Sequence, residues 1–252
     1  MKNSIGITER GDPVFDLNWL PWVQAGNATI LITKDPAKLH DVLTRIKDSD
    51  SFNVIIHTTI TGYGKTIIEP NVPTWQDSIT GYHNLHKYYG EDRVVLRIDP
   101  IIPTEKGIAL VKEIITAASK MSTTQLYNGT MNFSSMKIKP RIRISFIDNY
   151  AHVKRRFKEL DIPVLPWDMH ARLDLRLKIW EELGRPEVCG EPGITCTGCV
   201  SEVDCKVLGV EPIDIGKGQR SHCSCLVNKK ELLVDRKRCF HKCAYCYWQD
   251  DV

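Results

Sequence analysis

The sequence predicts an α/β protein in which parallel strands alternate with helices, as in a complete or partial (β/α) barrel. Two observations lead to this prediction. Short β-branched runs alternate with amphipathic stretches of helical period at least five times along the chain. Conspicuous polar residues follow several of these runs directly, and (β/α) barrels place their active sites at the C-terminal ends of their strands.

The bulk composition fits one large domain, or a barrel with a small appendage. The chain has 252 residues, of which 42% are hydrophobic, and its net charge is only +3. No apolar run reaches the roughly 18 residues of a membrane span, and no signal peptide opens the chain. We therefore expect a cytoplasmic protein without a membrane partner. Its nine cysteines are then better explained as metal ligands than as disulfides, because the cytosol keeps thiols reduced.

The first half of the chain contains four expected strands, at Ser4–Thr8, Ala28–Thr33, Asn53–Ile60 and Arg93–Ile98. Each is a short run enriched in Ile, Val or Thr, which favour extended backbone. Three helices are expected between them, one through Trp19 and Trp22, one at Pro36–Lys47 and one at Trp75–Tyr89. The second of these carries apolar residues three and four positions apart, the spacing of a helix face that packs against a sheet.

The second half continues the alternation and contains two segments that depart from it. Helices are expected at Gly107–Met121, Ala151–Leu160 and Ala171–Leu183, and strands at Arg141–Phe146 and Glu231–Asp235. The segment Ser122–Lys139 is polar and aperiodic, which predicts a mobile surface insertion. The segment Cys189–Cys225 is rich in Gly and Cys and has little periodicity, so we expect it to fold around something other than a hydrophobic core.

A cysteine triplet with C-x3-C-x2-C spacing, Cys239, Cys243 and Cys246, stands near the end of the chain. Iron–sulfur clusters are normally held by four cysteines, so three thiolates on one loop would leave the fourth iron of a [4Fe–4S] cluster open. The spacing matches the signature of radical S-adenosylmethionine (SAM) enzymes, including an aromatic residue before the third cysteine. In that family SAM chelates the open iron, and one electron cleaves it to a 5′-deoxyadenosyl radical. Zinc ribbons also use C-x2-C pairs and are the alternative.

The position of the triplet in the chain differs from that in an ordinary radical SAM barrel, where the first strand leads into the cluster loop. Here the expected strand Glu231–Asp235 leads into it, and the other strands lie upstream. The sequence therefore predicts a circularly permuted partial (β/α) barrel of the radical SAM type, with a Cys-rich C-terminal segment. We expect residues 1–186 to form the barrel, 187–228 an auxiliary metal segment, and 229–252 the final strand and cluster loop.

Several segments resemble a bacterial and phage family of radical-SAM-like proteins that carry a C-terminal CxxxCxYCY motif. The matching segments are Ile32–Pro36, Thr59–Gly64, Glu69–Pro73, Arg97–Ile102, Ile144–Asp148 and the tail from Gln219 to Tyr247. A more distant similarity is to spore photoproduct lyase, a radical SAM enzyme that repairs a thymine dimer in DNA. This similarity rests on Tyr245-Cys246-Tyr247, Thr33-Lys34 and Asp99–Ile102.

The resemblance implies roles for residues around SAM. Lys34 would contact the SAM carboxylate, which suits a lysine ammonium at a strand end, whereas the alternative is a surface lysine. Tyr245 and Tyr247 would pack around SAM and the substrate as catalytic residues, and the alternative is a pair of core tyrosines.

Other candidates come from positions at or near strand ends. Asp99 follows a buried-looking strand and would be a catalytic residue that also binds the SAM ribose or amine, although it also suits a helix N-cap or an Asx turn. Arg97, a further cofactor-binding candidate, and Asp148 share this ambiguity. Ser145 alternates with apolar neighbours, so we expect it to point into the barrel toward SAM. Glu69 and Asn71 are expected to line the substrate pocket.

A second metal site is expected from the remaining cysteines. The family resemblance implies that Cys189, Cys199, Cys223 and Cys225 form the shared set. Four thiolates can hold either a second [4Fe–4S] cluster or a zinc ion, and reduced buried cysteines are the remaining alternative. Cys196 and Cys205 are extra to that set.

The predicted function is a radical SAM enzyme, a lyase or isomerase, that abstracts hydrogen from a C–H bond of a thymine-type base in DNA, to modify, rearrange or repair it. A base in a duplex would have to be flipped out to reach the site. Basic residues within 137–143, 154–158 and 229–238 permit a phosphate-binding surface. Flavodoxin or ferredoxin would supply the electron. One alternative is a radical SAM enzyme acting on a small molecule or peptide, and another is a non-catalytic metal- and nucleic-acid-binding module.

Overall fold

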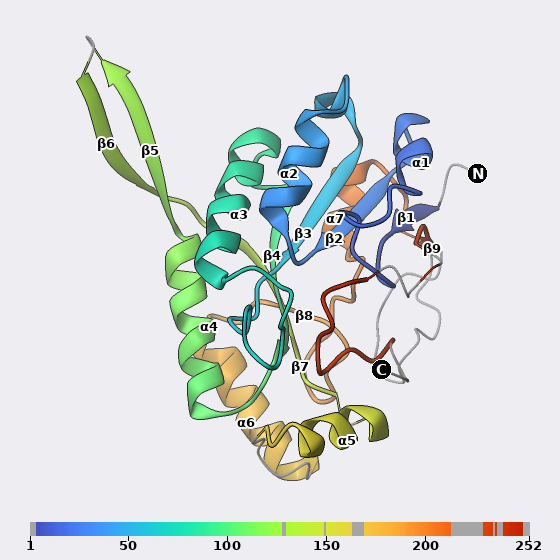
Figure 1. Ribbon diagram of the computed structural model, residues 1–252, viewed down its shortest axis with the longest axis vertical. Helices are drawn as coiled ribbons and strands as arrows, with labels where there is room; N and C mark the ends of the chain where they lie inside the picture. The colour runs from blue at the N-terminus through green and yellow to red at the C-terminus, as the bar shows by residue number, and fades with distance from the viewer. Residues whose placement is uncertain are drawn as a thin grey trace.

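The computed structural model describes residues 4–127, 130–148, 150–162, 169–212, 229–233, 235 and 239–248 of the chain. Its main feature is a seven-stranded sheet, curved into half of a barrel, in which all neighbouring strands are parallel (Figure 1). The strand order is β8-β7-β4-β3-β2-β1-β9. The strands are β1 (Ile5–Ile7), β2 (Thr29–Thr33), β3 (Val54–Thr59), β4 (Val94–Ile101), β7 (Arg141–Phe146), β8 (Glu187–Val188) and β9 (Lys229–Glu231). The predicted α/β partial barrel is confirmed.

Three long helices cover the outer face of the sheet (Figure 1). They are α2 (Pro36–Thr44), α3 (Trp75–Tyr89) and α4 (Glu105–Ala118). Each begins at a residue whose side chain accepts a hydrogen bond from a backbone N–H of the first turn, namely Asp35, Thr74 and Thr104. Alternate strand residues such as Leu31, Ile56 and Leu96 pack against these helices in the larger hydrophobic core. The remaining helices before the cysteine-rich segment are α1 (Leu20–Gln24), α5 (Ala151–Glu159) and α6 (Met169–Glu182).

The inner face of the sheet packs against a helix that the sequence analysis did not predict. This helix, α7 (Glu202–Leu208), lies inside the cysteine-rich segment. Ser201 and Asp204 form a reciprocal capping box at its start, and Gly209 ends it in the left-handed conformation. Its residues Cys205 and Leu208 are buried against the inward-facing residues of the strands. This part of the segment therefore does contribute to a hydrophobic core, contrary to the expectation.

The segment Ser122–Lys139, expected to be an aperiodic and mobile surface insertion, contains regular structure, so the expected lack of periodic structure is corrected. The structure has an antiparallel hairpin there, β5 (Lys120–Tyr127) and β6 (Thr130–Lys137), which projects from the body of the protein (Figure 1). Tyr127 pairs with Thr130, so two residues connect the strands. The missed signal is the sequence Asn128-Gly129, because Asn-Gly favours the tight turns of two-residue hairpins.

Strand β9 lies at the edge of the sheet and leads toward the cysteine triplet. It covers Lys229–Glu231, slightly earlier than expected, and pairs in parallel with β1. The strand before the triplet therefore stands beside the strand that opens the chain, as the predicted permutation requires. Within the described residues, no helix is both long and apolar enough to cross a membrane. The proposed boundaries at 186 and 228 stay predictions, and β8 joins the segment after 186 to the barrel sheet.

Candidate active site

A cleft opens at the C-terminal ends of the strands. It contains about 930 Å³ of atom-free space, including the part open to solvent. All three cysteines of the triplet line it, together with Lys34, Arg97, Asp99, Tyr245 and Tyr247. Most of the residues singled out from the sequence thus meet in one place, although they come from opposite ends of the chain.

The loop that carries the triplet is fastened to neighbouring loops by hydrogen bonds. Asn71 Nδ2 donates to the carbonyl of Phe240 at 2.7 Å, and the Ala244 N–H donates to the carbonyl of Ile68 at 2.9 Å. Asn71 is exposed and therefore positions this loop, in place of the pocket-lining role that was expected for it. The guanidinium of Arg156 donates to the carbonyl of Cys246.

A buried carboxylate, Asp12, connects this loop to the strands. It accepts hydrogen bonds from the Thr33 hydroxyl at 2.9 Å and from the Lys34 backbone N–H at 2.7 Å. His241 Nε2 lies 2.8 Å from the same carboxylate, and both side chains are almost fully buried, at 3% and 2% exposure. The sequence analysis missed Asp12 and His241. The available signals were an acidic residue in the loop after the first strand and a histidine inside the cysteine motif.

Lys34 is not a free surface lysine. Its ammonium lies 3.0 Å from Glu69 Oε1 and 2.6 Å from the Tyr245 hydroxyl. The Tyr245 hydroxyl itself donates to Glu69, and the Thr61 hydroxyl donates to the other carboxylate oxygen at 2.5 Å. Glu69 is only 1% exposed. Glu69 therefore holds the Lys34 ammonium from the protein interior. The expectation that Glu69 lines the pocket is wrong.

Electrostatics keep the Lys34–Glu69 pair charged. Burial lowers the pKa of Lys34, but the charges of Glu69 and Cys243 outweigh burial and bring this pKa above its ordinary value. Burial raises the pKa of Glu69, but Lys34 and the hydrogen bonds from Thr61 and Tyr245 bring it below its ordinary value. Burial also raises the pKa of Tyr245 well above its usual range, so the phenol stays protonated. An ammonium has three N–H donors, and among the described residues Glu69 and Tyr245 take two, which leaves one for a ligand in the cleft.

A second charged pair, Arg97 and Asp99, also lines the cleft. The two residues form an ion pair, and the hydroxyl of Ser145 donates to Asp99. Ser145 points inward as expected but contacts Asp99 and is not part of the cleft lining. The N-cap alternative for Asp99 is wrong, because α4 begins later and is capped by Thr104. Asp148 also lines the cleft.

Aromatic rings stand at the rim of the cleft. Tyr247 stacks against the exposed Tyr150, with ring centroids 6.0 Å apart, and packs against Trp248 at 4.9 Å. The guanidinium of Arg10 lies over the Trp248 ring at 5.0 Å. Planar groups from the first strand's loop, α5 and the end of the chain therefore meet here.

The cysteine triplet fits the donor set of an iron–sulfur cluster. Each cysteine of a [4Fe–4S] cluster binds a different iron, so its ligands surround the cluster and do not meet at one point. The three cysteines are placed around one cleft, and Cys243 is the most buried. Among the described residues, no three His, Cys, Asp or Glu side chains are grouped tightly enough to hold one metal ion. Burial raises the pKa of Cys239 to about 11, and metal binding deprotonates such a thiol.

Comparison with known proteins places the chain in a family. The chain belongs to the family described as Domain of unknown function (DUF1848). The match covers residues 23–248, which include both cysteine-containing regions and all of the cleft-lining residues from Ile32 onward. No curated protein matches the chain.

The second group of cysteines lies partly within the described residues. Cys189 and Cys199 are neighbours, with their sulfur atoms 3.1 Å apart. Cys223 and Cys225 lie outside the described residues. The two extra cysteines are placed elsewhere: Cys196 hydrogen-bonds to the backbone of Glu191, and Cys205 is buried in α7.

The basic stretches are not all surface features. Arg141 and Arg143 lie on the inner face of β7 and pair with Glu187 and Asp204. Strand alternation places both on the same inward face as Ser145. The phosphate-binding surface expected from residues 137–143 is therefore corrected for these two positions.

Proposed function

We propose that this protein is a radical SAM enzyme whose cluster is held by Cys239, Cys243 and Cys246. The observation that carries the proposal is that the three cysteines line the same cleft as Lys34, at the C-terminal ends of parallel strands. When bound, the cluster and SAM supply a one-electron reduction that generates a 5′-deoxyadenosyl radical able to abstract hydrogen from a C–H bond. A flavodoxin or ferredoxin would provide the electron.

The residues of the chain have three tasks in this proposal. Lys34, held by Glu69 and Tyr245, binds the carboxylate of SAM with its remaining N–H donor. Arg97 and Asp99, which line the same cleft, present a guanidinium and a carboxylate for the polar groups of SAM. The Asp12–His241 contact keeps the cluster loop against the Thr33–Lys34 strand end, so the distance between Lys34 and the cysteines is maintained.

The apolar part of the lining protects the reaction. Ile32, Phe146 and Ile147 line the cleft between the polar groups. Apolar walls exclude water and other hydrogen donors, which would otherwise quench a reactive intermediate. The same apolar side chains would also contact the substrate and keep its reacting carbon close to the site where hydrogen is removed.

A thymine-type base in DNA is the proposed substrate. The rim rings Tyr150, Tyr247 and Trp248 support it, because aromatic side chains stack on nucleobases. The helix α5 next to this rim carries basic residues, namely Lys154, Arg155 and Lys158. Lysine and arginine that neutralise phosphates release counterions, which makes binding depend on salt. The base would be modified, rearranged or repaired after it leaves the stack.

The radical chemistry is tested by anaerobic reconstitution with iron and sulfide, followed by SAM and dithionite. We expect the brown protein to form 5′-deoxyadenosine. Replacing Cys239, Cys243 and Cys246 together with Ala should abolish this product, whereas Cys196→Ser should retain it because that thiol lies outside the cleft lining. Cleavage of SAM by the triple variant would end the proposal, and a colourless protein that binds only zinc would support a non-catalytic module.

The substrate is tested with the same protein and DNA. Binding to a thymine-containing oligonucleotide should weaken steeply with salt. Changing Lys154, Arg155 and Lys158 to Gln should flatten that dependence by about 0.9 in log–log slope for each DNA phosphate that the variant no longer neutralises. Arg156 is left unchanged because it supports Cys246. Two results together would favour the alternative substrates. The enzyme would turn over a free small molecule or peptide as well as it turns over DNA, and the variant with Gln at Lys154, Arg155 and Lys158 would show the same salt dependence as wild type.

A further inference from the structure

The loop of the cysteine triplet has an outer face that the cleft does not use. Alternate residues of this loop, Cys239, His241 and Cys243, line the cleft. Phe240 and Lys242 stand between them, do not line the cleft and are exposed to solvent. Because these two residues are bonded directly to Cys239 and Cys243, a protein that contacts them comes close to the cluster ligands without entering the cleft.

Large apolar side chains are exposed on this outer face and on the loop beside it. Phe240 and Ile67 are each 58% exposed. Ile67 belongs to the same loop as Asn71, whose side chain donates to the Phe240 carbonyl at 2.7 Å. The Phe240 ring also packs edge-on against Phe15, with ring centroids 5.4 Å apart. Apolar side chains that are exposed together and bordered by polar residues are typical of protein contact sites.

Lysines border these apolar side chains. Lys65 and Lys242 are the exposed charged residues of the two loops, and the Lys38 ammonium lies 4.7 Å from the centroid of the Phe15 ring. Glu69, the one carboxylate within residues 65–71 and 239–248, is buried. The surface is therefore positively charged around exposed apolar groups. We call it the outer patch, and it consists of Phe15, Lys38, Lys65, Ile67, Phe240 and Lys242.

We infer that the outer patch is the docking surface for the electron donor, a small acidic one-electron carrier protein of the flavodoxin kind. This inference rests on the proposed function, which requires one electron for each SAM that is cleaved. The carrier loses one electron and the cluster gains it, and no bond forms or breaks in this step. Electron transfer slows steeply with distance, which favours docking on the loop that holds the cluster ligands.

The charge and the extent of the outer patch suit such a partner. A flavodoxin carries carboxylates around the apolar edge of its flavin, and these complement lysines around exposed apolar side chains. Complementary charges speed the encounter of two proteins and fix their relative orientation. Complexes of redox proteins bury little surface, less than about 1,200 Å², so a patch of a few side chains is sufficient.

The first test compares two reductants in the formation of 5′-deoxyadenosine from SAM, namely reduced flavodoxin and dithionite. Lys38, Lys65 and Lys242 are changed together to Gln. With limiting flavodoxin, product formation should fall about tenfold, because three exposed charge pairs are lost. With dithionite, a small ion that needs no docking surface, the rate should be unchanged.

The matched control removes the same charge elsewhere. Lys47, Lys87 and Lys112 are exposed residues just after α2, in α3 and in α4. Their joint change to Gln should leave both rates at the wild-type level. Equal losses with flavodoxin in the two triple variants, or no loss in the variant of the outer patch, would overturn the inference.

A direct measurement of flavodoxin binding separates this inference from the proposed function. Oxidised flavodoxin is added to the protein without SAM, at increasing salt concentration. The variant of the outer patch should bind more weakly and with a smaller salt dependence than wild type. Binding that this variant leaves unchanged would overturn the docking surface. A wild-type protein that cleaves no SAM with dithionite would overturn the proposed function instead, whatever the binding result.

Discussion

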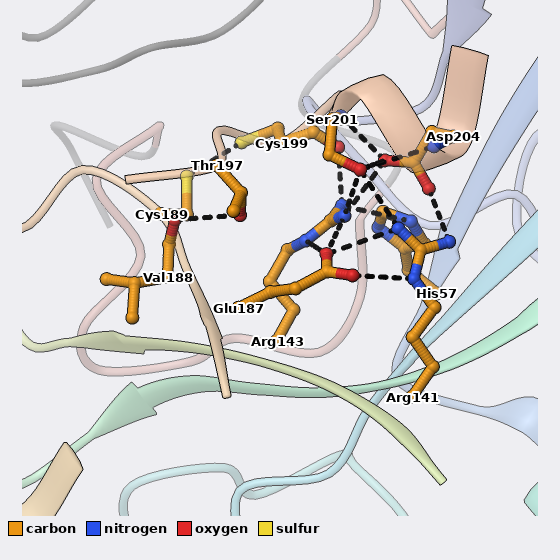
Figure 2. A network of polar contacts seen from close by, with 10 residues as sticks. All are labelled: His57, Arg141, Arg143, Glu187, Val188, Cys189, Thr197, Cys199, Ser201 and Asp204. Atoms are coloured by element: carbon orange, nitrogen blue, oxygen red, sulfur yellow. Dashed lines mark hydrogen bonds and ion pairs between the residues drawn. The ribbon is translucent and has the colours of Figure 1, made fainter. Parts of the chain in front are cut away.

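The two cysteine-containing regions of this chain are held by different kinds of interaction. The loop of Cys239, Cys243 and Cys246 depends on separate hydrogen bonds from surrounding loops, and its cysteines are spread around an open cleft. The Cys189–Cys199 turn is attached to a buried network of paired charges, and its sulfurs are 3.1 Å apart. An open cleft leaves room for a ligand, whereas the tight turn holds its two thiols in direct contact (Figure 2). Cysteine spacing along the chain therefore does not by itself decide the kind of site.

The largest expected effect concerns the network. Changing Arg143 to Leu removes a fully buried cation and leaves Asp204 and Glu187 with less compensation. Breaking a buried ion pair from one side costs about 3–5 kcal/mol of unfolding free energy. Urea denaturation of the purified variant measures this loss.

The control for this change is an ion pair at the surface. Lys112 and Glu182 lie 2.6 Å apart, with their side chains 52% and 37% exposed. Changing Lys112 to Met should cost about 0–1 kcal/mol, because solvent screens exposed pairs. Equal losses of unfolding free energy in the two variants would mean that the buried network stabilises the fold no more than an exposed ion pair does.

The next effect concerns ligand binding at the cluster loop. Changing Lys34 to Met removes the proposed partner of the SAM carboxylate but no thiol. A hydrogen bond to a charged group contributes about 1.5–3 kcal/mol, so SAM should bind about tenfold more weakly or worse. Equilibrium binding to reconstituted protein measures this, with iron content as the check on cluster assembly. The exposed Lys87→Met is the control, and a dissociation constant that Lys34→Met leaves unchanged would remove Lys34 from the site.

The smallest expected effect is a dependence of the free energy of unfolding on pH. It arises at β9, the strand that leads toward the cysteine triplet. Glu231, at the end of β9, accepts backbone N–H groups of Glu9, Arg10 and Leu233. Burial, together with the nearby Glu9, raises the pKa of Glu231 to about 7, above its ordinary 4.5. The folded state therefore keeps a proton that the unfolded chain loses. The stability that this proton contributes is fully present below pH 4.5 and is lost as the pH rises toward 7.

Changing Glu231 to Gln should remove this slope. Between pH 4.5 and 7 the difference in unfolding free energy between wild type and variant should change by on the order of 1–2 kcal/mol, because the side chain is partly exposed and solvent screens it. In the ionic network, the arginines outweigh burial and hold the pKa of Asp204 well below its usual range, so Asp204 contributes no slope in this window. Burial, together with Arg143, lowers the pKa of His57 well below its ordinary 6.5, so His57 makes stability rise with pH in wild type and variant alike, and this contribution cancels in the difference between them. Parallel curves for wild type and variant would contradict this assignment.

The sequence by itself determined the alternation of strands and helices, the residues of β7 and α3, and the cysteine triplet. These features depend on local patterns: the period of apolar residues, the capping residue before a helix, and the spacing along one loop. The hairpin β5–β6 also had a local signal, Asn128-Gly129, which was outweighed by the polar composition around it.

Only the tertiary structure decided which residues meet. Glu69, Lys34 and Tyr245 are far apart in the chain, and so are Asp12 and His241, yet each set forms direct contacts. Nothing in the local pattern of Arg141 and Arg143 distinguishes a surface cluster from a buried one, because their partners Glu187 and Asp204 arrive from later segments. The physical reason is that burial and charge compensation depend on distances in the folded chain, and local periodicity carries no record of those distances.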